Sequence, residues 1–386
     1  MENKRIAVIN RTNFKNYGSV LQCFALCEAI KQLGYESEIV WVNGGISDHY
    51  DIRFRKIFSS MLTLLVNPGL LNELKRNIKS INATVISEET DRLFNQFVNN
   101  YINRSFYTTR QLTRIARSNY YDVFICGSDQ IWNPHSLYLD PLLFLQFAPK
   151  NKRIAYAPSL GCEEIPAHNK KKLSRYVKSI SYVSIRETKG AMLLHDLIGV
   201  NYPVVCDPTL LLDSNFWNNY TEDNRKNNYV LCYFLNVPSE IVQKQIEEFA
   251  GQNNKTMILL NSKFDAMTCS KLKILYPDCG PCEFLGYVKN ADYIFTDSYH
   301  GMLFSIIFKK NFASIERDYK EYNQSSRQIS ILEELGLRER YGKYFTEQMK
   351  NQISYSDVYK KLGYFRQKSI EYLKNSIEKV INDGKN

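Results

Sequence analysis

The chain has 386 residues, of which 44% are hydrophobic and 23% are charged, and its formal net charge is +10. This length suits two domains, and the composition is typical of a globular protein and excludes an intrinsically disordered one. No apolar run reaches the roughly 20 residues that a membrane-spanning helix needs. The apolar run at residues 6–9 is too short for a signal-peptide core, so we expect a cytoplasmic protein.

Nine cysteines are scattered along the chain, most of them inside apolar runs such as residues 230–234. Buried thiols in a reducing compartment explain this pattern better than a disulfide framework does.

The positive charge is concentrated in residues 52–118, which hold eleven Lys and Arg against four Asp and Glu. Such a segment can meet nucleic acid, an anionic membrane surface or an acidic polymer, and a solvated helical face is an equally good explanation. No nucleic-acid motif is present, so we expect no nucleic acid partner. A peripheral contact with the inner face of the cell membrane is the interaction we consider.

In chain order, residues 6–10 read as a buried strand and residues 37–42 as the next one. Between them, apolar side chains recur at helical spacing over residues 20–33. Residues 52–118 break this rhythm; they are helical in pattern and interrupted at Pro68-Gly69, so we expect a helical insertion.

Strand-like runs then alternate with helical patterns, which favours parallel α/β units. A polar stretch at residues 213–228 predicts a domain boundary, and the tail from residue 356 carries apolar residues at helical spacing up to Gly384. The strand-like runs are residues 123–126, 154–156, 182–185, 203–206, 229–237, 257–260 and 293–296.

These elements predict an α/β protein with two Rossmann-like domains facing a cleft, the helical insertion in the first domain and an amphipathic helix at the C-terminus. The predicted domains are residues 1–215 and 216–350, followed by the helix at 351–386. In open α/β sheets, ligands bind beyond the carboxyl ends of the strands, which places the expected site between the two sheets.

Four loops that follow predicted strands carry polar side chains. They are Asn13 to Ser19, Gly127 to Pro134, Ser184 to Glu187, and Thr296 to Gly301.

Each loop also has a purely structural explanation. The first could simply cap a helix, Arg186 could pair with Glu187, and His300 could be a buried core histidine. For His300 the neighbours Asp297 and Ser298 at a helix start favour a functional explanation. A helix N-terminus attracts anions, and an imidazole transfers protons near neutral pH.

The sequence Cys279-Gly-Pro-Cys282 has the spacing of a redox-active thiol pair or of half a metal site. The residues around it do not match a redox motif, and no second cysteine pair lies nearby, so we disfavour both explanations and expect no metal. A Walker-type loop and a Gly-x-Gly-x-x-Gly fingerprint are also absent from the sequence.

Seven motifs in a fixed order, from about residue 6 to residue 340, resemble the polysaccharide pyruvyltransferase family. Each motif alone is weak, but their order is specific. They are Asn16-Tyr17-Gly18 with Leu21-Gln22, Gly127 to Asn133, Tyr156-Ala-Pro-Ser159, Ser184-Ile-Arg186-Glu187, Asp207-Pro208-Thr209, Thr296 to Gly301, and Ser326-Arg327 with Leu335-Gly-Leu337.

The resemblance implies a glycosyltransferase-B-like fold and transfer of a pyruvyl group from phosphoenolpyruvate to a sugar hydroxyl pair, as in the synthesis of capsule or exopolysaccharide. It implies no cofactor. The partners would be phosphoenolpyruvate and a sugar or lipid-linked oligosaccharide acceptor.

The same resemblance assigns the catalytic roles, with Arg186 binding the donor and His300 acting as acid and base. Weaker candidates for a second cation are Arg327 and Lys309. The remaining candidates for substrate binding are Asn16, Tyr17, Gly18, Ser128, Asp129, Gln130, Asp297 and Ser298.

One position departs from the family pattern, because Ser298 stands where characterised-type members carry an arginine, two residues before His300. Two other functions therefore stay open at this point. The chain could be a nucleotide-sugar glycosyltransferase of the same fold, or a polysaccharide-binding protein without catalysis.

Overall fold

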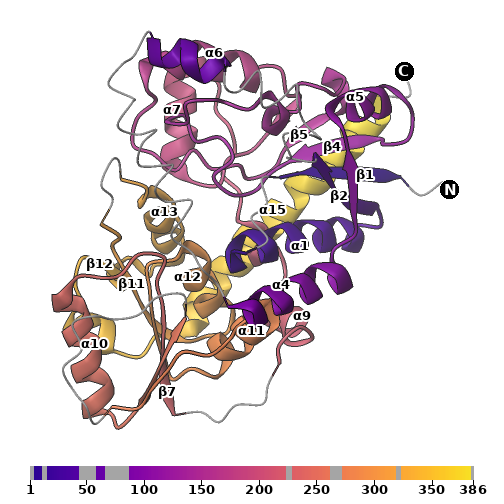
Figure 1. The fold of residues 1–386 in the computed structure, drawn as a ribbon. Coiled ribbons are helices and arrows are strands. Elements are labelled where there is room, and N and C mark those ends of the chain that lie inside the picture. The colour runs from indigo at the N-terminus through magenta and orange to yellow at the C-terminus, as the bar shows by residue number, and fades with distance from the viewer. Residues whose placement is uncertain are drawn as a thin grey trace.

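The computed structural model describes residues 4–10, 15–42, 58–65, 87–222, 228–260, 272–318 and 323–383, and these form two six-stranded parallel sheets (Figure 1). The first sheet comprises β1 (Arg5–Ile9), β2 (Glu36–Val42), β3 (Arg104–Tyr107), β4 (Val123–Cys126), β5 (Arg153–Ala155) and β6 (Tyr182–Val183). The second comprises β7 (Tyr229–Tyr233), β8 (Thr256–Leu260), β9 (Ile274–Leu275), β10 (Tyr293–Thr296), β11 (Asn311–Ile315) and β12 (Tyr341–Gly342).

Both sheets have the strand order of the Rossmann fold. The first runs β3-β2-β1-β4-β5-β6, and the second runs β12-β11-β10-β7-β8-β9, which is the same order when it is counted from its own first strand. The prediction of two Rossmann-like α/β units is confirmed. The predicted domain boundary after residue 215 would fall inside helix α9 and stays a prediction.

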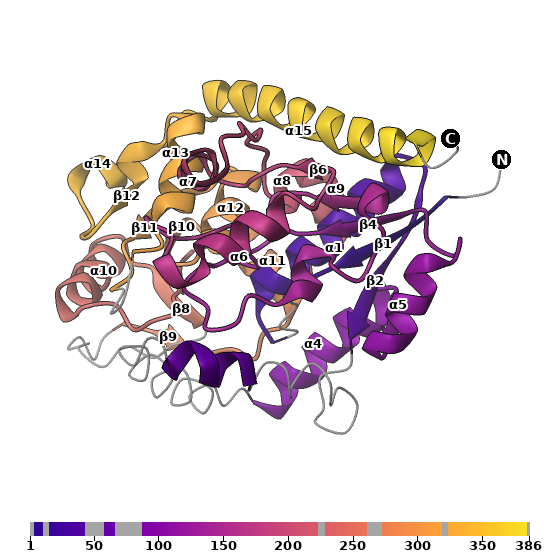
Figure 2. The same cartoon turned by 90° about the horizontal axis from the view of Figure 1, so that it is seen from above.

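Helices connect the parallel strands and cover both sheets (Figures 1 and 2). They are α1 (Tyr17–Gln32), α4 (Glu88–Tyr101), α5 (Thr109–Arg117), α6 (Ala167–Val177), α7 (Thr188–Ile198), α8 (Pro208–Leu211), α9 (Ser214–Asn218), α10 (Glu240–Gln252), α11 (Pro281–Asn290), α12 (Tyr299–Ile307), α13 (Ser326–Leu335), α14 (Glu347–Lys350) and α15 (Tyr355–Asp383).

The segment predicted as a helical insertion is not wholly helical. Its described part contains a helix at residues 58–65, then α4 and α5, but β3 lies between the last two and pairs with β2. The prediction was wrong for β3, because its sequence Arg-Ser-Phe-Tyr is too short and too polar to show a strand period. Residues 52–57 and 66–86 of this segment lie outside the described residues.

Another predicted strand, at residues 203–206, is reduced to a single bridge between Ile185 and Val204. The C-terminal helix is confirmed as α15 up to Asp383, and Gly384 lies outside the described residues. Figure 2 shows α15 running along one side of the molecule beside elements of both sheets. Its buried face includes Leu362 and Leu373.

Helix α1 is buried on more than the one face that its apolar spacing predicts. It packs on α8 and also on α11 and α12 of the second half, and its residues share one continuous hydrophobic core with them. Tyr17 lies at this junction. Its ring stacks on Phe284 at 4.6 Å between centroids and on Phe94 at 4.9 Å, and its hydroxyl donates to the carbonyl of Cys279 at 2.9 Å.

Tyr17, a predicted substrate contact, is therefore expected to act as a packing residue. Tyr17→Phe removes one buried hydrogen bond and keeps the stack, so it should lower the free energy of unfolding by about 1 kcal/mol and leave turnover unchanged. Urea denaturation measures the first effect. Tyr120→Phe, at an exposed tyrosine, is the matched control and should change neither. A loss of turnover in Tyr17→Phe without a loss of stability would indicate instead that Tyr17 contacts the substrate.

Candidate active site

Helices α1 and α12 begin against each other where the two sheets meet. A Cβ at residue 18 would lie 2.1 Å from Nδ1 of His300, so only glycine lets the imidazole ring lie against the first turn of α1. Asn16 caps α1 and Ser298 caps α12, each through its side chain. These local signals hold His300, the second residue of α12, beside the start of α1.

His300 is one member of a buried charged cluster with Arg186 and Asp207. Nη1 of Arg186 donates to Oδ2 of Asp207 at 2.8 Å, and Nε2 of His300 lies 3.5 Å from the same oxygen. The other carboxylate oxygen caps α8 by accepting from the backbone and hydroxyl of Thr209. Side-chain exposure is 1% for Arg186 and 0% for Asp207. Asp207 therefore fixes both partners while it begins a helix.

Arg186 retains donors that no described residue uses. Its Nε and Nη2 are buried and have no hydrogen-bond acceptor in the part of the chain that the structure describes. Nη2 lies 3.7 Å from Oδ1 of Asp129. The guanidinium carbon lies 4.5 Å from the centre of the Tyr299 ring, and that of Arg327 lies 5.6 Å from the same centre. Two arginines thus converge on one aromatic ring.

The cluster keeps its carboxylates ionised. Burial by itself would raise the pKa of Asp207, but His300 and Arg186 outweigh burial and hold this pKa well below its ordinary value. Burial also opposes ionisation of Asp129, and Arg186, His300 and Arg327 together lower its pKa. A site built in this way pairs fixed cations with an imidazole that can exchange protons.

In the predicted loop after β4, three consecutive residues make three different kinds of contact. Ser128 is fully buried, and its hydroxyl donates to the carbonyl of Ala157 at 2.7 Å, so it holds the loop in place. Asp129, with a φ of 70°, turns its half-buried carboxylate toward Arg186. Nε2 of Gln130 donates to Oε1 of Gln324 at 3.0 Å, which links the two halves of the chain.

Asp297 and Ser298 support His300 through contacts within the protein. The Asp297 carboxylate accepts from the backbone N–H groups of Leu235 and Asn236 and from Nε of Arg317. Ser298 accepts from a backbone N–H of the first turn of α12. Both residues lie next to the cluster, and both fix the loop that begins α12.

The structure does not bring the predicted substrate contact Lys309 to this site. Lys309 follows the C-terminal end of α12, nine residues after His300, which corresponds to about 13 Å along a helix. Its amine lies 4.4 Å from the centre of the Tyr359 ring on α15. The sequence could not show this, because a lysine near a helix end gives no sign of the end that faces the site.

The Cys279–Cys282 pair packs at the start of α11 without the features of a redox centre. Cys279 is buried, and no disulfide joins it to Cys282 in the described part of the chain. Burial, together with Glu283 and Glu222, raises the pKa of Cys282 to about 12, whereas a reactive thiol needs a lowered pKa.

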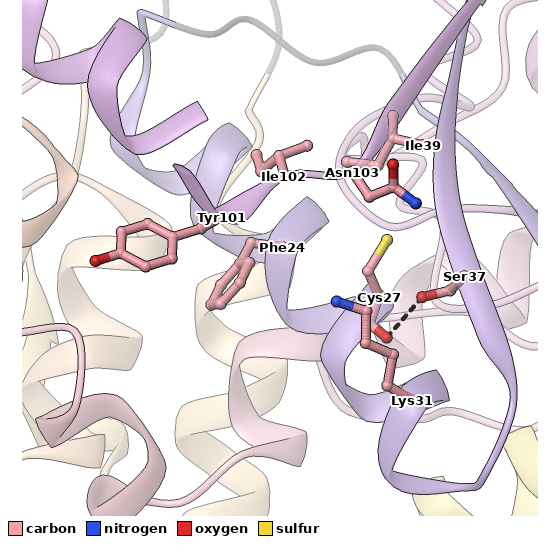
Figure 3. Close-up of a pocket in the computed structure, with 8 residues that line it drawn as sticks. All are labelled: Phe24, Cys27, Lys31, Ser37, Ile39, Tyr101, Ile102 and Asn103. Atoms are coloured by element: carbon pink, nitrogen blue, oxygen red, sulfur yellow. Dashed lines mark hydrogen bonds between the residues drawn. The ribbon is translucent and has the colours of Figure 1, made fainter. Parts of the chain in front are cut away.

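A cavity of about 150 Å³ reaches the cluster from one side. Its lining comes from α7, α12, α13, α15 and the segment before α8, and it includes Arg186, Asp207 and Tyr299. A second hollow, between α1, β2 and the end of α4, is lined mainly by Phe24, Ile39 and Tyr101 and leaves no space for a water molecule (Figure 3). Only the first of these two can admit a ligand.

The described residues contain neither a cluster of metal ligands nor a membrane-spanning helix. No three His, Cys, Asp or Glu side chains among the described residues lie close enough to hold a metal ion. No helix in the described ranges is long and apolar enough to cross a membrane.

The sequence did not single out Asp207, Tyr299 or Gln324 as site residues. Asp207 was visible only as part of Asp-Pro-Thr, which is a helix-start signal, and this signal concealed its second role toward Arg186 and His300. Tyr299 lies within the motif from Thr296 to Gly301, next to His300, but nothing in the motif marked it as a site residue. No local pattern marked Gln324, which reaches the site only through the fold.

The ionised Asp207 predicts a specific pH dependence of stability. Because its folded pKa is depressed, its contribution to stability is present above its unfolded pKa of about 4 and is lost as the pH falls further. Asp207→Asn leaves Arg186 without its buried partner and should cost about 3 kcal/mol at pH 7. Chemical denaturation from pH 7 to pH 3 should show that the difference in free energy of unfolding between Asp207→Asn and the wild type becomes smaller. A difference that does not depend on pH would contradict an ionised, paired Asp207.

The fold resembles that of sugar-nucleotide enzymes of the glycosyltransferase-B type. A putative UDP-N-acetylglucosamine 2-epimerase from Listeria monocytogenes is 8% identical, with a TM-score of 0.50 over 99% of this chain and 91% of that chain. The UDP-N-acetylglucosamine 2-epimerase from Rickettsia bellii is 7% identical, with a TM-score of 0.49 over 98% of each chain. MurG from Acinetobacter baumannii is 9% identical, with a TM-score of 0.42 over 98% and 95%. At these identities the likeness concerns the fold alone.

A comparison with curated proteins gave no match. The model of one protein family, described as polysaccharide pyruvyl transferase, matches residues 16–319, which include the starts of α1 and α12 and the cluster around Arg186. This match covers most of the chain and agrees with the order of the sequence motifs. The chain belongs to the polysaccharide pyruvyl transferase family.

Proposed function

We propose that this protein transfers the pyruvyl group of phosphoenolpyruvate to two hydroxyls of a sugar and forms a ketal, in the synthesis of a surface polysaccharide. Family membership supports a transferase of this class. The observation that carries the choice of donor is the buried guanidinium of Arg186, which keeps two nitrogens without acceptors among the described residues and lies beside His300.

The donor is a small anion whose carboxylate and phosphate lie next to each other. Arginine suits such a ligand because its planar fork donates to two oxygens at once. Arg186 would bind one anionic group. Arg327 would supply the second cation, since its guanidinium converges on the same Tyr299 ring. In this chain Ser298 caps α12, and Arg327 takes over the charge of the arginine that the family carries there.

The reaction needs one group that gives and takes protons. Protonation of the methylene carbon of the enol phosphate turns CH₂ into CH₃ and makes the adjacent carbon electrophilic. One sugar hydroxyl adds to that carbon, the carbon–oxygen bond to phosphate breaks, and a second hydroxyl closes the ring. Two hydroxyl protons are released: one replaces the proton given to the methylene carbon, and the other leaves with phosphate.

In this proposal His300 is the proton-transfer group. Its Nε2 lies 3.5 Å from Oδ2 of the ionised Asp207, which would orient the ring. Its Nδ1 lies at the start of α1, where Asn16 and Gly18 bring the backbone close. Asp129, whose carboxylate lies 3.7 Å from Nη2 of Arg186, and the next residue, Gln130, would position the acceptor sugar.

The function is tested by incubating the protein with phosphoenolpyruvate and candidate glycans and measuring phosphate release together with the mass gained by the glycan. We expect turnover in the wild type. His300→Gln should lower kcat by about 10²–10⁴-fold with a cooperative thermal transition retained, because it removes general acid–base catalysis. Arg327→Ala should mainly raise KM for phosphoenolpyruvate.

Lys309→Ala is the matched control for Arg327→Ala, since its side chain lies at the far end of α12. Protection against thermal unfolding by a nucleoside diphosphate but not by phosphoenolpyruvate would instead favour a nucleotide-sugar glycosyltransferase. Glycan binding without turnover would favour the non-catalytic alternative.

We also propose that the protein meets an anionic membrane surface, where a lipid-linked acceptor would be presented. The helix at residues 58–65 carries four exposed large apolar side chains at spacings of three and four residues, so they share one face. In the sequence this helix follows Arg53, Arg55 and Lys56 within a strongly basic segment. An apolar face next to basic residues is typical of helices that lie in the membrane interface. The exposed side chains are Phe58, Met61, Leu62 and Leu65, with exposures of 57%, 58%, 48% and 77%.

Flotation with anionic liposomes tests this contact. Replacing the four apolar residues with Ser should abolish co-flotation, and so should neutralising the basic residues of the segment. Met192→Ser, at an exposed apolar residue on α7, is the control and should float as the wild type does. Flotation that neither set of changes reduces would reject the membrane contact and leave the proposed chemistry untouched.

A further inference from the structure

The cavity of about 150 Å³ reaches Arg186 from the side of the molecule that carries α15. Arg186, Asp207 and Tyr299 form its inner wall, whereas none of Gly18, Asp129 and His300 lines it. The charged cluster therefore has two sides, one facing His300 and the other facing this cavity.

The mouth of the cavity is formed by exposed polar and aromatic side chains of three helices. Lys368 and Tyr364 come from α15, with the Lys368 amine 4.5 Å from the centre of the Tyr364 ring. Glu334 comes from α13. Beside them the hydroxyl of Thr188 on α7 lies 3.0 Å from that of Ser330 on α13, so the mouth is closed in by elements of both halves.

The chemistry of the lining favours a small anion at the inner end. Arg186 is 1% exposed, and its Nε and Nη2 have no acceptor within the described ranges. Of the two carboxylates in the lining, Asp207 is already paired with Arg186 and His300, and Glu334 lies at the mouth. Of the paired hydroxyls of Thr188 and Ser330, the one that does not donate to the other can donate to an oxyanion. The volume holds an ion the size of phosphate but not a nucleotide.

We propose that this cavity is a binding site and exit route for inorganic phosphate, which would sit against Arg186 and leave past Lys368. The inference rests on the proposed function, in which phosphate is the leaving group. It adds that phosphate departs on the α15 side, while the sugar stays on the side of His300. Lys368 attracts the ion to the mouth, and Glu334 opposes it.

Titration calorimetry with inorganic phosphate alone, without donor or glycan, tests the site. Lys368→Glu should weaken phosphate binding by about tenfold or more, because it reverses a charge at the mouth. Lys368→Arg should restore binding, and Glu334→Gln should tighten it. Lys374→Glu is the matched control, since Lys374 lies on α15 outside the cavity lining and is 55% exposed.

In steady-state assays, phosphate should inhibit the wild type and the Lys374→Glu variant more strongly than the Lys368→Glu variant. Wild-type protein that does not bind phosphate, or Lys368→Glu protein that binds it as the wild type does, would overturn the proposal. Phosphate binding that depends on Lys368 in a protein without pyruvyl transfer would instead retain the site and reject the proposed function. All four substitutions are at exposed helix positions, so loss of folding does not obscure the result.

Discussion

The buried ion pair between Arg186 and Asp207 is the interaction on which the site depends. Two charges removed from water are costly unless each is fully satisfied, and Asp207 is satisfied by Arg186, Thr209 and the nearby His300. Arg186 is not, because its remaining donors have no acceptor among the described residues. This imbalance leaves a buried cation with unused donors beside Asp207, and the proposed binding of an anion at Arg186 rests on it.

The fold brings these groups together by joining two Rossmann units through α1. The helix is buried against both halves, and Gly18 allows α12 to approach so closely that His300 touches the first turn of α1. Arg186 and Asp207 come from the first half, whereas His300, Tyr299 and Arg327 come from the second. The groups of the cluster therefore belong to neither sheet alone, and any change in how the halves pack alters their geometry.

The sequence predicted the sheets and the loops after their strands well, because buried parallel strands are apolar runs with polar residues at their carboxyl ends. Arg186, His300, Asp129 and Arg327 were predicted, and the structure brings them together. The period of two failed for β3, which is short and polar. Local patterns also could not show that the side chains of Asp297, Ser298 and Tyr17 make contacts within the protein that support the fold. They could not show either that Lys309 lies at the end of α12 away from His300. Those distinctions depend on contacts between residues far apart in the chain.

The most direct measurement of the central claim is the affinity of phosphoenolpyruvate for Arg186→Lys protein. Lysine keeps the charge and the pair with Asp207 but loses the planar fork, so the variant should melt cooperatively and bind phosphoenolpyruvate at least about tenfold more weakly. Binding as tight as that of the wild type, in a protein with unchanged melting, would show that the arginine between the two sheets does not hold the donor.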